Sequence, residues 1–248
     1  MSRSAWYIGC RQEEVGGAAL LVGDRARIDR IAEHLEKPIF LEENRGLRTV
    51  TGSRSGRRVT ASAFGMGGPI AAIVLHELFD LGVRRFVRVG TAMVMPPAKL
   101  GDMVLADGAV RGEGTSLTYA PIGYPAVADF NLSAALRAAL SRHSVSWRAG
   151  LFGTYDGFYT EMFALSSGEK RPIDAMRDEV KRLGLIATDM ETATILTAGR
   201  VLGAQAASLC LGTVDGLTQE KIEPAALASG EREMFEIALE AIVADPPL

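Results

Sequence analysis

Charged residues stand at the ends of several predicted strands, where an α/β sheet usually presents its binding groups. Arg88 lies inside the apolar segment 84–95, and Thr91 follows three residues later. A buried guanidinium is costly unless it is paired, so Arg88 either pairs with a structural carboxylate or binds an anionic ligand. Gly23 ends another apolar segment where a helix begins, with Arg27 one turn further on. Free backbone N–H groups at such a point bind anions, and the four residues together are typical of a phosphate site.

Three carboxylates also occupy strand ends. Asp189 and Glu191 lie where a predicted strand passes into a helix. In this position a carboxylate can simply cap the helix, or it can accept hydrogen bonds from the two hydroxyls of a sugar. Asp215 follows the apolar segment 204–214 and precedes a glycine, which is an ordinary turn signal. The pattern leaves both a structural and a functional role open for each carboxylate.

The elements that must position these residues alternate along the whole chain of 248 residues. Short apolar runs predict strands at 17–23, 57–68, 84–95, 101–110, 146–155, 185–189 and 204–214. Helical spacing and capping residues predict helices at 24–36, 69–82, 129–143, 190–203 and 231–243, and a polar loop leads into a further helix within 167–184. No linker separates them, so we expect a single α/β domain over 1–248 with a mostly parallel sheet.

The composition argues against several classes of protein. The net charge is −3, and the 27 basic residues are spread along the chain, whereas a nucleic-acid-binding protein would show a basic stripe. Cys10 and Cys210 form no CxxC pair, and the three histidines have unrelated spacings, so neither a disulfide framework nor a metal site is expected. No signal peptide and no apolar run of about 18 residues is present. We therefore expect a cytoplasmic protein without a nucleic-acid or membrane partner.

Several motifs together resemble the nucleoside phosphorylase family, which includes hexameric purine nucleoside phosphorylase and uridine phosphorylase. The resemblance runs from about Trp6 to Val243 and is carried by VGDRARI, FGMGGP, VRVGT and TDMETAT. The segment EGTSLTYAPIGYPAVADF is similar to the uridine branch in particular. The resemblance implies a central, partly closed mixed sheet flanked by helices, and a pentosyltransferase that cleaves a nucleoside with inorganic phosphate and needs no cofactor. A nucleosidase that uses water and a non-catalytic nucleoside-binding protein are the alternatives.

The same resemblance implies a role for each matching residue. Phosphate would be held by Gly23, Arg27, Arg88, Thr91 and, from a neighbouring subunit, Arg45. Ribose would be held by Asp189, Met190, Glu191 and the neighbour's Tyr7, which stands where the family usually has a histidine. The base would contact Phe158, Met93 and Asp215, and Arg88 and Asp215 would be the catalytic residues. Such a site implies self-association, as a dimer or as a hexamer of dimers.

The positions expected to meet the base depart from the uridine branch. Met162 and Ala164 stand where that branch has a glutamine and an arginine that read the pyrimidine edge. Asp215 stands where the purine branch keeps the acid that protonates the base, with Lys221 or Arg232 as a candidate partner. We therefore expect a purine nucleoside to be cleaved faster than uridine, with a uridine phosphorylase as the alternative. The choice between ribose and deoxyribose stays open.

Overall fold

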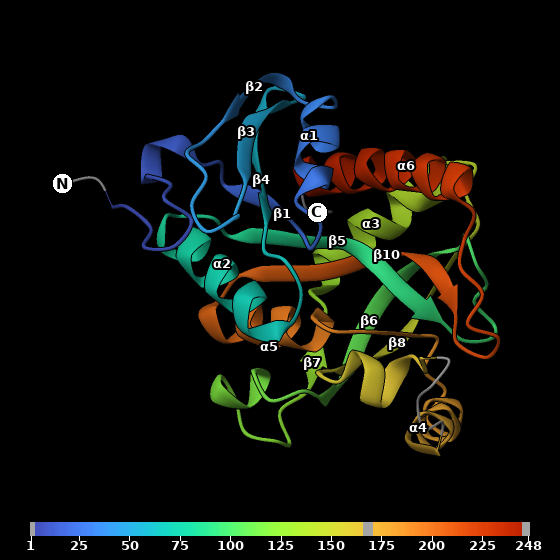
Figure 1. The fold of residues 1–248 in the computed structure, drawn as a ribbon. Helices are drawn as coiled ribbons and strands as arrows, with labels where there is room; N and C mark the ends of the chain where they lie inside the picture. Colours follow the sequence, from blue (N-terminus) through green and yellow to red (C-terminus); the bar gives the residue numbers. More distant parts are fainter. Residues whose placement is uncertain (1–2, 166–170, 245–248) are drawn as a thin grey trace.

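The computed structural model describes residues 3–165 and 171–244 (Figure 1). Strands and helices alternate over much of this length, but two strands that were not expected, at 36–40 and 49–54, follow one another directly. The strands are β1 Ala18–Val22, β2 Glu36–Phe40, β3 Thr49–Arg54, β4 Arg57–Ala63, β5 Arg85–Val94, β6 Met103–Gly112, β7 Ala126–Val127, β8 Trp147–Tyr155, β9 Ala187–Asp189 and β10 Gln205–Asp215. The α-helices are α1 Ala26–Ala32, α2 Gly68–Asp80, α3 Phe130–Arg142, α4 Arg171–Arg182, α5 Thr192–Leu202 and α6 Pro224–Val243. Short helical turns form at η1 Gln12–Glu14, η2 Ser116–Thr118 and η3 Phe158–Met162, the last of them π-helical.

The strands form one mixed sheet that closes on itself along part of its length. β5 pairs in parallel with β10, β10 pairs antiparallel with β6, β6 and β8 are parallel, β8 and β9 are parallel, and β9 returns antiparallel to β5. These five strands make a ring without a free edge. The order then continues outward from β5 through β1, β4 and β3 to β2. The partly closed mixed sheet is confirmed, and the parallel pairs expected from alternation occur in it beside antiparallel ones.

Helices cover both faces of the sheet, and each face has its own apolar core. Residues of α1, α3 and α6 pack on one face, and residues of α2 and α5 pack on the other (Figure 1). In β1, Leu20 belongs to the first core and Leu21 to the second, and both side chains are fully buried. Burying such a side chain stabilises the fold by roughly 1.5–3 kcal/mol. This burial on both faces explains why the central strands read as continuous apolar runs.

Some element boundaries differ from those expected. Helix α1 ends at Ala32 instead of continuing to 36, because the chain turns there into β2 at the edge of the sheet. All residues of β2 are exposed, so it has no apolar periodicity, and its Pro38 is tolerated because an edge strand has unpaired backbone groups. Helix α6 begins at Pro224, seven residues before the apolar pattern at 231, with a proline in its first turn.

His143 links the end of α3 to α6. Its two ring nitrogens lie 3.1 Å from a carboxylate oxygen of Glu233 and 3.0 Å from one of Glu240, which also pairs with Arg142. The hydrogen bond to Glu240 raises the pKa of His143; partial burial opposes the shift, and Glu233 adds to it. Because the folded pKa is raised, the stabilisation is fully present below the ordinary value of about 6.5 and is lost as pH rises through the folded value.

We therefore expect His143→Gln to lower the midpoint of thermal unfolding more at pH 5.5 than at pH 9. The difference should correspond to at most about 1 kcal/mol, because the pair is partly exposed. Thermal melts of both proteins at the two pH values measure it. An equal loss at both pH values would show that His143 acts through packing and not through its charge.

Two further expectations concern absences. Among the described helices, none has the length and apolar character that a membrane span requires. Within residues 3–165 and 171–244, no group of three or more histidine, cysteine or acidic side chains is placed to hold a metal ion.

Candidate active site

Arg88 lies on β5 between β1 and β10, and its side chain is almost completely buried. Its Nη2 lies 2.6 Å from Glu191 Oε2 and 3.2 Å from Asp189 Oδ2, and its Nη1 donates to Cys210 Sγ at 2.6 Å. Burial acts to lower the pKa of Arg88, but Cys210, Asp189 and Glu191 raise it by more, so the guanidinium stays charged. Its partners are the same carboxylates that were expected to bind ribose. The candidate phosphate and sugar groups therefore form one site.

The guanidinium fits because of a glycine on its own strand. A Cβ atom at Gly90 would lie 2.3 Å from Arg88 Nη1, which is well inside van der Waals contact. Gly90 pairs across the sheet with Cys210 of β10, so the missing side chain leaves the space between these strands to Arg88. The glycine of the VRVGT motif thus has a local steric reason.

Asp189 and Glu191 lie at the junction of β9 and α5. The sequence left helix capping and sugar binding open for both carboxylates, and their contacts differ. Asp189 accepts hydrogen bonds from the backbone N–H and hydroxyl of Thr192 and from the Thr154 hydroxyl, so it caps the start of α5. Glu191 makes no such capping bond. Instead its Oε1 accepts a 2.7 Å hydrogen bond from the backbone N–H of Gly67, and its Oε2 faces Arg88. Glu191 is therefore the carboxylate that is aimed at the site.

The loop after β1 leads into α1, where a second arginine forms an ion pair with an acid far away in the sequence. Gly23 is required by a close backbone approach, since a Cβ atom there would lie 2.8 Å from the Gly65 carbonyl oxygen. Arg27 is buried, and its Nε lies 2.8 Å from Glu231 Oε1, while Arg30 lies 2.9 Å from Glu231 Oε2. Glu231, which is on α6, thus forms ion pairs with both arginines of α1.

Sequence reasoning missed Glu231, although a signal was present. It is a buried acid three and four residues before the core residues Met234 and Phe235. That spacing places it on the apolar face of the predicted helix. A carboxylate on such a face is costly unless it is paired, so the pattern called for a basic partner.

A cavity of about 470 Å³ opens beside these arginines. Its lining combines residues of the VGDRARI loop, β5, β10 and α6: Asp24, Arg27, Arg30, Thr91, Thr213, Pro224, Leu227, Ala228 and Glu231. Arg27 and Thr91 come from two motifs that are separate in the sequence, and the fold brings both to one cavity. An anion placed there would meet two guanidinium groups, the donors that phosphate favours, beside the carboxylates of Glu231 and Asp24.

The residues expected at the base gather in a second, apolar group, which we call the methionine cluster. It contains Met93, Tyr155 and Met162, with Phe158, Phe163, Met176, Met190 and Val214 packed against them. The ring of Phe158, in η3, stacks on Phe163 with centroids 5.6 Å apart. Of the residues expected at the base, Phe158 and Met93 lie in this cluster, together with Met190, which was expected at the ribose.

Asp215 ends β10 and forms the turn that its Asp-Gly sequence indicated. Its Oδ1 accepts hydrogen bonds of 2.8 Å from the backbone N–H groups of Leu217 and Thr218. Lys221 places its Nζ 5.6 Å from the Phe163 ring centroid, and Arg232 is exposed on α6. Within the described part of the chain, no ion pair joins Asp215 to either of these candidate partners.

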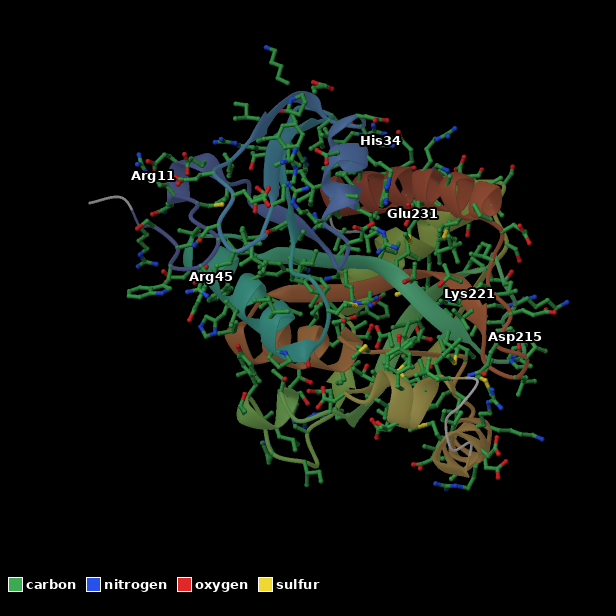
Figure 2. The ribbon with its side chains drawn as sticks, in the orientation of Figure 1. Arg11, His34, Arg45, Asp215, Lys221 and Glu231 are labelled. Atoms are coloured by element: carbon green, nitrogen blue, oxygen red, sulfur yellow. The ribbon has the colours of Figure 1, made fainter. Side chains whose placement is uncertain are left out.

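Tyr7 and Arg45 lie next to each other but away from the Asp215 end of the molecule. The Arg45 guanidinium lies 5.3 Å from the centroid of the Tyr7 ring, and Asn44 donates a 2.8 Å hydrogen bond to the Tyr7 carbonyl oxygen. Figure 2 shows Arg45 on the opposite side of the ribbon from Asp215 and Lys221. A single chain therefore does not bring this pair to the methionine cluster.

The chain is similar to known phosphorylases in sequence and in fold. The profile of the Phosphorylase superfamily matches residues 18–243. The chain is 32% identical to uridine phosphorylase of Escherichia coli (strain K12), over 97% of this chain and 98% of that protein. It is 34% identical to a guanosine phosphorylase of Halorubrum lacusprofundi, over 82% and 79% of the two chains. A crystal structure of uridine phosphorylase from Vibrio fischeri ES114 superposes with a TM-score of 0.87 at 30% identity, covering 96% of each chain.

The family match and the similar uridine phosphorylases indicate that the protein is a pentosyltransferase, an enzyme that uses nucleoside and phosphate. The chain belongs to the Phosphorylase superfamily, within its nucleoside phosphorylases. The family resemblance found in the motifs is thereby confirmed.

Proposed function

We propose that the protein cleaves the N-glycosidic bond of uridine with inorganic phosphate, giving uracil and ribose 1-phosphate. The observation that carries the phosphorolysis is the contact of Arg88 with Glu191, because it joins an anion-binding group to a sugar-binding group in one buried site. Uridine is favoured because most of the similar proteins compared are uridine phosphorylases. The purine preference expected from Met162, Ala164 and Asp215 is not supported by these comparisons, which favour the alternative.

In the proposed reaction the phosphate oxygen attacks C1′ while the base leaves, through an oxocarbenium-like state similar to that of glycoside hydrolysis. The nucleophile comes from solution, so the chain acts by positioning and by electrostatic stabilisation. Arg88, Arg27, Thr91 and the backbone N–H of Gly23 hold phosphate. Glu191 accepts hydrogen bonds from the ribose hydroxyls, and Met190 lies under the sugar. No metal or organic cofactor has a part in this scheme.

The test is base release from uridine with and without phosphate. Phosphorolysis requires that product formation depends on phosphate and that ribose 1-phosphate accumulates. Release of free ribose at an equal rate in phosphate-free buffer would instead show a nucleosidase. Binding without any release would show a nucleoside-binding protein on this fold.

A purine nucleoside is the second candidate substrate, because Met162 and Ala164 offer a pyrimidine no polar side chain. We expect kcat/KM at saturating phosphate to be higher for uridine than for inosine, guanosine or adenosine. We also expect Asp215→Asn to change kcat/KM for uridine by less than about tenfold, since an asparagine can still accept the two turn hydrogen bonds. Faster purine cleavage together with a loss of about 10²-fold in Asp215→Asn would identify Asp215 as the general acid for a purine.

We further propose that the active protein is at least a dimer, and a cytoplasmic hexamer of dimers in its full form, in which Arg45 and Tyr7 complete a neighbour's site. Arg45→Ala and Arg88→Ala should each be nearly inactive alone. When the two are unfolded together and refolded, random pairing makes half of the dimers mixed. One site of each mixed dimer regains both arginines, so about a quarter of wild-type activity should return. An active monomer, measured by light scattering during turnover, would contradict the proposal.

A further inference from the structure

Two buried hydroxyls on the sheet have no hydrogen-bond partner among the described residues. They are Tyr155 Oη, on a residue that is 5% exposed, and Thr188 Oγ1, on a residue that is 4% exposed. A buried hydroxyl without a partner costs free energy, and such groups in native proteins are generally satisfied by another group, by water or by a ligand. Thr188 lies on β9 next to Asp189, and Tyr155 ends β8 three residues before Phe158.

The strand register places the two hydroxyls on the same face. Thr188 of β9 pairs with Met93 of β5 on one side and with Gly153 of β8 on the other. Tyr155 is two residues beyond Gly153, so its side chain leaves the same face of β8. Its ring lies back over the glycines, since a Cβ atom at Gly153 would be 2.8 Å from Tyr155 Oη and one at Gly112 would be 2.4 Å from the ring. The tyrosine hydroxyl therefore lies over Gly153, the residue that pairs with Thr188.

The surroundings of this pair are those expected for a base. Tyr155 packs in the methionine cluster, next to Met93 and Met162, with Phe158 and Met190 against them. These neighbours offer flat or polarisable apolar surface but no strong hydrogen-bonding group. Burial raises the pKa of Tyr155 to about 12, with Glu179 and Glu161 adding to the shift. The phenol therefore stays protonated at neutral pH and can donate a hydrogen bond.

We propose that the hydroxyls of Tyr155 and Thr188 are the groups that read the base, one donating to a carbonyl oxygen and the other accepting from the adjacent ring N–H. The inference rests on the proposed function and deepens it. A hydroxyl can both donate and accept, so the pair fits a lactam edge, the O4 and N3–H of uracil or the O6 and N1–H of a 6-oxopurine. These hydroxyls replace polar side chains that positions 162 and 164 lack.

The test removes each partner in turn. Tyr155→Phe and Thr188→Val are compared with wild type, and Tyr119→Phe is the matched control because its hydroxyl pairs with His76. The substrates are uridine and the riboside of pyrimidin-2-one, which lacks the 4-carbonyl group. We expect Tyr155→Phe to lower kcat/KM for uridine by about tenfold, the effect of one neutral hydrogen bond. For the pyrimidin-2-one riboside the loss should be less than about twofold, because the hydrogen bond is already missing.

Several outcomes decide the inference. Unchanged KM for phosphate and an unchanged unfolding midpoint in Tyr155→Phe would support it, because a structural role would move stability. An equal loss on both substrates, or no loss on uridine, would overturn it. The proposed function fails separately, if wild type shows no phosphate-dependent release from any nucleoside. In that case the inference is tested by binding: free uracil should raise the unfolding midpoint of wild type more than that of Tyr155→Phe. An equal rise in both proteins would overturn the inference.

Discussion

Arg88→Ala is expected to lower kcat by about 10²-fold or more and to raise the KM for phosphate. A preorganised charge in a buried site contributes a few kcal/mol to the transition state, because no solvent must reorganise there. Steady-state kinetics at varied phosphate measure both effects. Arg84→Ala serves as the control, because Arg84 is exposed just before the same strand and its guanidinium contacts the backbone carbonyls of Phe79 and Val83 and the Phe79 ring.

The same substitution should also destabilise the protein. Without the guanidinium, Asp189 and Glu191 would remain buried with their charges uncompensated, and breaking such a buried pair costs about 3–5 kcal/mol. Arg88→Lys separates the two effects, because it keeps the charge but loses the planar fork that contacts several groups at once. A folded Arg88→Ala protein with unchanged phosphate kinetics would show that Arg88 is structural. Phosphate would then have to be bound by Arg27 and Thr91 without it.

Glu191→Gln should lower kcat/KM for uridine by about 10²-fold, because hydrogen bonds to a charged acceptor are worth about 1.5–3 kcal/mol. The amide has almost the same shape, but its single carbonyl oxygen can accept from Gly67 or from Arg88 and not from both, so the loss reports the charge together with the Arg88 contact. The loss should be smaller for 2′-deoxyuridine, which has one hydroxyl fewer to bind. Kinetics on both nucleosides measure the difference.

Asp189→Asn is the matched comparison for Glu191→Gln. Since Asp189 caps α5 through Thr192, its loss should appear mainly in stability, at about 1 kcal/mol. If Asp189→Asn has the larger kinetic effect and Glu191→Gln has little, the two carboxylates have been assigned the wrong way round.

Local signals in the sequence sufficed for much of the fold and for the positions of the site residues. Apolar runs ending in glycine marked β1, β4 and β5, and these strands carry or flank Gly23, Arg88 and Thr91. Strand β2 escaped because all of its residues are exposed, so no apolar period marks it. The alternation of strands and helices also could not predict which strand pairs are antiparallel, because the direction of a strand depends on partners far away in the chain.

The sequence pattern could not predict which side chains form ion pairs with the site residues. Arg88 meets Glu191 across 103 positions, and Arg27 meets Glu231 across 204. Pairings over such distances are created only by the closed sheet and by the packing of α6 on it. The base remained open for a related reason. Met162 and Ala164 indicated that polar side chains are missing at the base. The hydroxyls of Tyr155 and Thr188, which we propose replace them, are placed together only by the strand register.

The ring of β5, β10, β6, β8 and β9 also determines how the molecule can open. A strand at the edge of an open sheet can fray by losing one seam of hydrogen bonds, but every strand of this ring is joined on both sides. Amide protons around Arg88 and Cys210 should therefore exchange with solvent only when the domain unfolds as a whole, whereas those of β2 exchange through local fraying. The central strands that carry Arg88 and Cys210 therefore keep their register while the exposed edge of the sheet opens.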